Sequence, residues 1–175
     1  MASMLEWPGV VIGVDGADAG RVVKIDLGGK DLYSGCAPPP EFVNLTALQT
    51  LDLSGSRFST LPAGFGNLAA LQTLDLSDTR LYDLPVGFGN LTALQTLDLS
   101  GTRLGTLPVG FGNLASLQTL DLSDTRLGCP PPCVADVQTA TLPAEFENLL
   151  DTLQTVDDWT TIQLYIIQGL WDKVA

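Results

Sequence analysis

One eleven-residue stretch decides the fold of this chain: Leu48-Gln-Thr-Leu-Asp-Leu-Ser-Gly-Ser-Arg-Phe58. Its leucines stand three residues apart up to Leu51 and two residues apart between Leu51 and Leu53. Neither a helix nor a hairpin keeps this spacing, which indicates a bend that leads into a short strand with one face turned inward. The same pattern returns three times at an offset of 23 residues, at Leu71–Leu81, Leu94–Leu104 and Leu117–Leu127.

Four units of this length align without gaps and organise the centre of the chain. They cover residues 41–63, 64–86, 87–109 and 110 onward. A single unit cannot bury its own leucine face, whereas stacked units share a continuous core. The periodicity therefore predicts a single-domain solenoid whose turns contact only their neighbours, with short parallel strands about 4.8 Å apart along one side.

The repeated residues resemble the leucine-rich repeat, L-x-x-L-x-L-x-x-N-x-L, in its 23-residue LP-x-x-F-x-N-L form. The resemblance implies an α/β fold, a leucine-rich repeat horseshoe with a parallel sheet on the concave face and short helical turns on the convex face. Toward the convex side we expect a stacked phenylalanine spine of Phe42, Phe65, Phe88, Phe111 and Phe146. We expect the helical turns there to start at Asn44, Asn67, Asn90 and Asn113.

The motif position that usually carries an asparagine holds a hydroxyl residue in this chain. These residues are Ser56, Thr79, Thr102 and Thr125. A hydroxyl offers fewer donors than an amide. We therefore expect hydroxyl bridges between adjacent turns, with lower stability and an unchanged architecture.

Atypical segments border the regular units within a single domain, 1–175. We assign 1–40 to an N-terminal cap with the first strand, 41–128 to four regular repeats, 129–140 to a Cys/Pro insertion, 141–159 to a degenerate fifth repeat and 160–175 to a C-terminal capping helix. Trp7-Pro-Gly-Val10 resembles the W-x-G-V cap of plant and protist leucine-rich repeat proteins in a truncated form. The C-terminal helix is expected to cover the open end of the core or to pack against a second copy of the chain.

The insertion carries the sequence Cys129-Pro-Pro-Pro-Cys133. If the prolines adopt polyproline II, the two Cα atoms lie about 12 Å apart, beyond the reach of about 7 Å that a disulfide allows. Only a tight turn or a cis proline would permit a bridge. We favour free thiols in a reducing compartment.

Composition argues against several classes of function. Eight Lys plus Arg against twenty Asp plus Glu give a net charge of −12, which disfavours nucleic acid as a partner. The chain has no histidine, so the Ser-His-Asp and Cys-His mechanisms and the usual zinc sites lack a member. We expect no catalysis, no cofactor and no metal. Without a signal-peptide pattern or a membrane-spanning apolar window, we favour a cytoplasmic location and expect no membrane partner.

Strand alternation predicts columns of polar side chains on the concave side, followed by an arginine column just past each strand. We define the polar strip as these candidate partner-binding residues: Thr50, Asp52, Ser54, Arg57, Thr73, Asp75, Ser77, Asp78, Arg80, Thr96, Asp98, Ser100, Arg103, Thr119, Asp121, Ser123, Asp124 and Arg126. Asp26 and Lys24 extend the columns backward. Like charges in a column repel, and the arginines are the nearest groups to offset that repulsion.

Several interpretations of the polar strip stay open at this point. Its Asp and Arg columns either neutralise each other to keep a repetitive surface soluble, or recognise a partner protein. A calcium site is disfavoured because the ion needs six to eight oxygens converging on a point, whereas a column presents them in a line. A regular Thr and Ser array that binds an ordered lattice such as ice is a further alternative.

The predicted function is non-enzymatic protein–protein recognition through the concave strip and the adjoining loops. The alternative is a structural or scaffolding protein that forms a homodimer through its C-terminal helix. Half of the net charge lies from Asp136 onward, so a basic partner would be steered toward that end.

Overall fold

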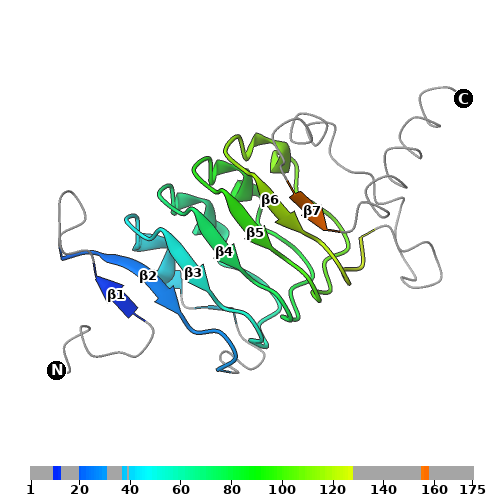
Figure 1. Ribbon diagram of the computed structural model, residues 1–175, viewed down its shortest axis with the longest axis horizontal. Coiled ribbons are helices and arrows are strands. Elements are labelled where there is room, and N and C mark those ends of the chain that lie inside the picture. Colours follow the sequence, from blue (N-terminus) through cyan, green and yellow to red (C-terminus); the bar gives the residue numbers. More distant parts are fainter. Residues whose placement is uncertain (1–9, 13–19, 31–36, 39, 128–154, 158–175) are drawn as a thin grey trace, which may run out of the picture.

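The computed structural model describes residues 10–12, 20–30, 37–38, 40–127 and 155–157, and its strands stand side by side in chain order (Figure 1). They form one seven-stranded sheet. The strands are β1 (Val10–Ile12), β2 (Val22–Asp26), β3 (Thr50–Asp52), β4 (Thr73–Asp75), β5 (Thr96–Asp98), β6 (Thr119–Asp121) and β7 (Thr155–Asp157). Strand β1 is antiparallel to β2, and all later pairs are parallel. The parallel sheet confirms the predicted solenoid.

The pairing register follows the sequence repeat. In β3 and β4, Leu51 lies beside Leu74 and Asp52 beside Asp75, and the same relation holds through β6. Strand β7 continues the register, because Asp157 lies beside Asp121. The aspartates therefore form a single file along the sheet, as predicted.

The core consists of the repeated leucines, which have almost no exposed surface. In each regular turn the two strand leucines, such as Leu51 and Leu53, are fully buried. Fully burying one such side chain stabilises the fold by about 1.5–3 kcal/mol. Because one turn supplies only one wall of this core, the stability of each turn depends on its neighbours.

Short 3-10 helices line the other side of the core. They are η3 (Pro40–Asn44), η4 (Ala63–Asn67), η5 (Val86–Asn90) and η6 (Phe111–Asn113). The predicted phenylalanine spine is confirmed for its three central members, since the ring centroids of Phe65 and Phe88 lie 6.2 Å apart and those of Phe88 and Phe111 lie 6.1 Å apart in near-parallel stacks. This spacing exceeds the 4.7–4.9 Å or so between paired strands. The stack is therefore wider on the helical side, which places the strands on the concave face.

The asparagines do not start the helical turns, so that prediction is wrong. Asn67 is the last residue of η4, and the helix begins after Pro62, whose carbonyl oxygen accepts the backbone N–H of Phe65 at 2.9 Å. Proline at the helix entry fixes φ, here −58°, and lacks the N–H that a helix start leaves unpaired. In η4 and η5 the Leu-Pro pair therefore supplies the start signal that the asparagine was expected to supply.

The hydroxyl residues do not bridge adjacent turns either. Thr79 Oγ1 donates to the carbonyl of Leu76 at 2.8 Å, and Thr102 Oγ1 makes the equivalent bond to Leu99, so each hydroxyl serves its own turn. A hydroxyl is one bond shorter than an amide and is satisfied locally. Adjacent turns are joined at this level by backbone bonds instead, such as that from Gly55 N to the Ser77 carbonyl oxygen at 2.8 Å.

Several predictions concern segments outside the described residues. They include the Trp7-Pro-Gly part of the cap motif, Phe146, the Cys/Pro insertion and the C-terminal helix. The boundaries assigned to these segments stay predictions.

On the convex side the backbones of adjacent turns leave no space for a side chain at two glycines. A Cβ atom on Gly66 would lie 2.0 Å from the carbonyl oxygen of Gly87, and one on Gly89 would lie 2.0 Å from that of Gly110. Both obstacles are backbone atoms, so a side chain there would force the turns apart.

Replacing Gly89 by alanine is expected to lower the free energy of unfolding by about 1–3 kcal/mol, because the new methyl group overlaps a backbone carbonyl. Gly105→Ala is the matched control, since a Cβ at Gly105 meets no atom within 4 Å. Urea unfolding followed by circular dichroism measures both variants. Equal stability of the two would contradict the close approach of the turns.

Ser56→Thr is expected to raise the free energy of unfolding by about 1 kcal/mol. The Ser56 hydroxyl is buried and has no hydrogen-bond partner among the described residues, whereas Thr79 and Thr102 at the equivalent position donate to a carbonyl. The same denaturation measurement, with Thr102→Ser as the reverse exchange, checks this. The prediction assumes that the methyl group of threonine turns the hydroxyl toward the carbonyl. If Thr102→Ser stabilised the chain, that assumption would be contradicted.

Candidate functional site

The strands bring the Thr and Asp members of the polar strip to one face of the sheet. In β3 the side chain of Leu51 is buried, whereas Thr50 and Asp52 are half-buried, and β4, β5 and β6 repeat this pattern. The half-buried Ser54, Ser77, Ser100 and Ser123 follow two residues after each aspartate. In-register pairing then aligns each residue type from turn to turn.

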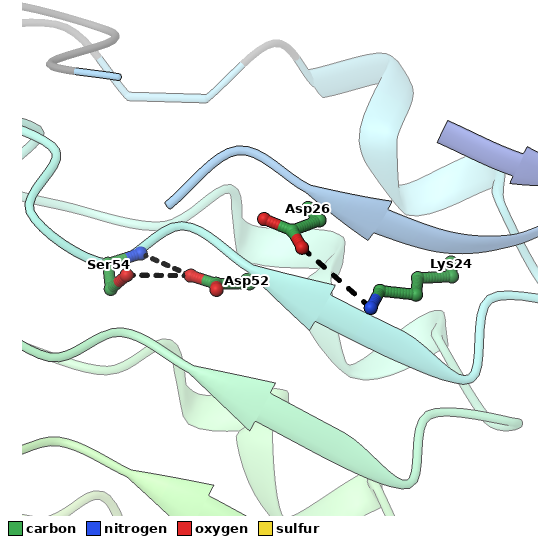
Figure 2. Close-up of polar contacts among 4 residues, drawn as sticks. All are labelled: Lys24, Asp26, Asp52 and Ser54. Carbon is green, nitrogen blue, oxygen red and sulfur yellow. Dashed lines mark hydrogen bonds and ion pairs between the residues drawn. The ribbon is translucent and has the colours of Figure 1, made fainter. Parts of the chain in front are cut away.

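Each aspartate of the regular repeats is held by the serine two residues later, as Figure 2 shows for Asp52 and Ser54. Oδ1 of Asp52 accepts the backbone N–H of Ser54 at 2.9 Å and its hydroxyl at 2.7 Å. The pairs Asp75–Ser77, Asp98–Ser100 and Asp121–Ser123 repeat both bonds at 2.6–2.9 Å. Two donors on one carboxylate oxygen hold the side chain in place and fix the turn that ends the strand.

The first aspartate of the file has a different partner. Asp26 Oδ2 lies 3.7 Å from Lys24 Nζ on the same strand, and both side chains are about half exposed (Figure 2). The position two residues after Asp26 is Gly28, where a Cβ would lie 2.8 Å from the oxygens of Asp52. An exposed ion pair of this kind contributes little to stability.

The residue after each serine adopts a left-handed conformation. Glycine and aspartate alternate at this position from turn to turn. Gly55 and Gly101 have φ of 67° and 65°, and Asp78 and Asp124 both have φ of 54°. Glycine adopts this region freely, and aspartate is among the few other residues that tolerate it. Asp78 and Asp124 are therefore turn residues of the polar strip.

Three members of the arginine column lie away from the aspartates of the strands. Arg80, Arg103 and Arg126 are exposed, and within the described ranges none of them forms an ion pair with an aspartate. The serine bonds satisfy one oxygen of each carboxylate instead. In the same ranges the structure gives Oδ2 of Asp75, Asp98 and Asp121 no hydrogen bond.

Sequence reasoning missed the Asp–Ser bonds and the left-handed turn. The signal was present, because aspartate two residues before serine is typical of a turn in which the carboxylate caps the backbone. The alternation of Gly and Asp at one position likewise indicates a positive φ. The part of the chain that the structure describes holds no group of three or more metal-ligating side chains, and none of its helices has the length and apolar character of a membrane span.

Asp98→Ala is expected to lower the free energy of unfolding by about 1–3 kcal/mol, because it leaves the donors of Ser100 without their acceptor. Arg103→Ala is expected to leave it unchanged within error, since that exposed side chain makes no ion pair in the described chain. Both variants are compared by urea unfolding. A larger loss for Arg103→Ala would restore the ion-pair interpretation.

Comparisons with known proteins agree with this geometry. A family model for the leucine-rich repeat region matches residues 26–129, more than half of the chain. A leucine-rich repeat protein from Leptospira interrogans is 31% identical with a TM-score of 0.59, over 72% of this chain and 28% of that one. No curated protein matches the chain.

Two plant structures are similar as well. The BIR3–SERK2 complex from Arabidopsis thaliana matches at 25% identity and a TM-score of 0.64, over 89% of this chain and 78% of that one. The GASSHO1/SCHENGEN3 ectodomain from Arabidopsis thaliana, solved with CASPARIAN STRIP INTEGRITY FACTOR 2, matches at 30% identity and a TM-score of 0.64, over 86% and 19%. From its matched family model and its sheet of in-register turns, the chain belongs to the leucine-rich repeat proteins.

Proposed function

We propose that the chain is a non-enzymatic protein-recognition module that binds a partner through the polar strip. The observation that carries this proposal is the alignment of identical polar residues from β3 to β6, which offers the same Thr, Asp and Ser groups at every turn. A solenoid displays such columns over several turns to one partner. The chain is assigned to the 23-residue LP-x-x-F-x-N-L type as part of the same proposal.

The chemistry of the columns favours a basic partner. One oxygen of each carboxylate is occupied by the serine two residues later, which holds the side chain in place. The second oxygen of Asp75, Asp98 and Asp121 accepts no hydrogen bond within the described chain and suits a lysine or arginine of the partner. The net charge of −12 adds long-range attraction for such a partner.

The surrounding residues support binding rather than catalysis. The exposed arginines of the polar strip can contact acidic or carbonyl groups of a partner. The absence of histidine from the sequence removes the commonest general base. Two plant neighbours were solved with another protein or with a named factor, which supports recognition as the use of this scaffold. The alternative of dimerisation through the C-terminal helix concerns residues outside the described ranges, and the cytoplasmic location stays a prediction.

Asp75→Asn with Asp98→Asn is expected to weaken partner binding at least tenfold, about 1.4 kcal/mol. Asparagine keeps the Oδ1 acceptor for Ser77 and Ser100 and removes the charge, so the fold is retained. The partner is first identified by affinity capture from the native source with mass spectrometry. Calorimetry with the purified partner then gives the dissociation constant.

Glu41→Gln with Asp83→Asn is the matched control, because it removes the same charge from exposed positions outside the polar strip. This control is expected to bind like the unaltered chain. Equal weakening by both pairs would attribute binding to net charge alone and contradict recognition by the strip. Unchanged binding in the first pair would place the interface elsewhere.

A further inference from the structure

Two of the asparagines that end the 3-10 turns belong to the tripeptide Asn-Leu-Thr. They are Asn44, followed by Leu45 and Thr46, and Asn90, followed by Leu91 and Thr92. The pattern Asn-x-Thr without proline at the central position is the acceptor motif for N-linked glycosylation.

The fold exposes the asparagine and the threonine of both motifs. In the first motif the central Leu45 is half-buried, and the Thr46 hydroxyl accepts a hydrogen bond from Arg21 Nη2 at 3.0 Å. Leu91 is fully buried, whereas Asn90 and Thr92 on either side of it are exposed. The tripeptide is a tight turn, in which Thr92 N donates to the Asn90 carbonyl oxygen at 2.8 Å and Leu91 has φ −74° and ψ 58°. The buried leucine anchors the turn, so the asparagine and the hydroxyl face solvent together.

The intervening repeats provide the same turn without the hydroxyl. Asn67 and Asn113 are exposed and end η4 and η6, but the residue two positions later is Ala69 or Ala115. The backbone bond that closes the turn is also present there, at 2.8 and 2.7 Å. The threonine is therefore unnecessary for the turn itself.

The two asparagines differ in the residue three positions before them. Asn90 follows a residue without a side chain, and its Nδ2 lies 3.6 Å from the place a Cβ of Gly87 would occupy. The equivalent residue before Asn44 is Glu41. Neighbouring turns are only about 6 Å apart at the phenylalanine spine. Because Asn44 and Asn90 are two turns apart, an unmodified turn separates them.

We propose that Asn44 and Asn90 carry N-linked glycans. In this reaction a lipid-linked oligosaccharide diphosphate is the donor. Nδ2 of the asparagine forms a bond to the anomeric carbon of the sugar, and the bond from that carbon to the diphosphate oxygen breaks. The lipid diphosphate leaves with the electron pair, and Nδ2 gives up one proton to the enzyme or to solvent.

This modification has two consequences for the molecule. The glycans project from the helical side, so the polar strip on the strands stays accessible. The chain must also enter a compartment that contains the oligosaccharide donor, which departs from the cytoplasmic location expected from the sequence. The proposal goes beyond protein recognition and stands or falls independently of it.

Mass spectrometry of the full chain from its native source tests the proposal. Peptide N-glycosidase converts a glycosylated asparagine to aspartate, so we expect this conversion at Asn44 and Asn90 and at neither Asn67 nor Asn113. Unmodified asparagine at both positions overturns the proposal. Modification at one position keeps the proposal for that site and removes it for the other.

A second experiment separates the motif from the source of the protein. The full chain with a leader for the endoplasmic reticulum is translated with microsomes, and we expect two steps of reduced electrophoretic mobility that glycosidase removes. Thr92→Ala is expected to lose one step, Thr46→Ala the other, and Ala69→Thr to add a third. Thr92→Ala reproduces the sequence of the intervening turns, so loss of folding is not expected. No step in the unaltered chain would contradict the proposal.

Discussion

Every column on this molecule depends on one constraint, the unbroken register between adjacent turns. From β3 to β6 each residue lies beside the residue 23 positions later, so side chains of the same type are neighbours in adjacent turns. For leucine and phenylalanine this alignment stabilises the fold, because equivalent apolar side chains of adjacent turns pack together in a continuous core. For aspartate it aligns like charges, and the Asp–Ser bonds supply the local stabilisation that this arrangement needs.

Two spacings then set the shape and divide the functions between the faces. Strand pairing holds the concave side at the hydrogen-bonding distance, whereas stacked phenylalanine rings hold the convex side at just over 6 Å. Gly66 and Gly89 let the convex backbones approach within this limit. The concave face thereby gathers the polar strip, and the convex face spreads its asparagines apart.

The sequence alone was sufficient for the solenoid, the strands and the single file of aspartates, because all three follow from the period and from strand alternation. It was insufficient for β1, a three-residue strand outside the repeat whose main cue is the run Val10-Val-Ile12. The predicted start of the helical turns was wrong because asparagine is a common N-cap residue, whereas the proline of the preceding Leu-Pro marks the start in this chain. The Asp–Ser bonds, and the position of Arg80 and Arg103 away from any aspartate in the described chain, depend on the backbone path after each strand, which periodicity does not encode.

The left-handed position after each serine has a consequence for how such an array changes its length. Asp78 leans over Gly101, where a Cβ would lie 2.5 Å from its carboxylate, whereas Gly29 and Gly55 lie beside each other without conflict. Loss of a glycine-bearing turn from the gene would bring two carboxylates into one crowded place, but loss of an aspartate-bearing turn would join two glycines. The alternation of aspartate and glycine at this position therefore keeps two carboxylates from meeting in adjacent turns.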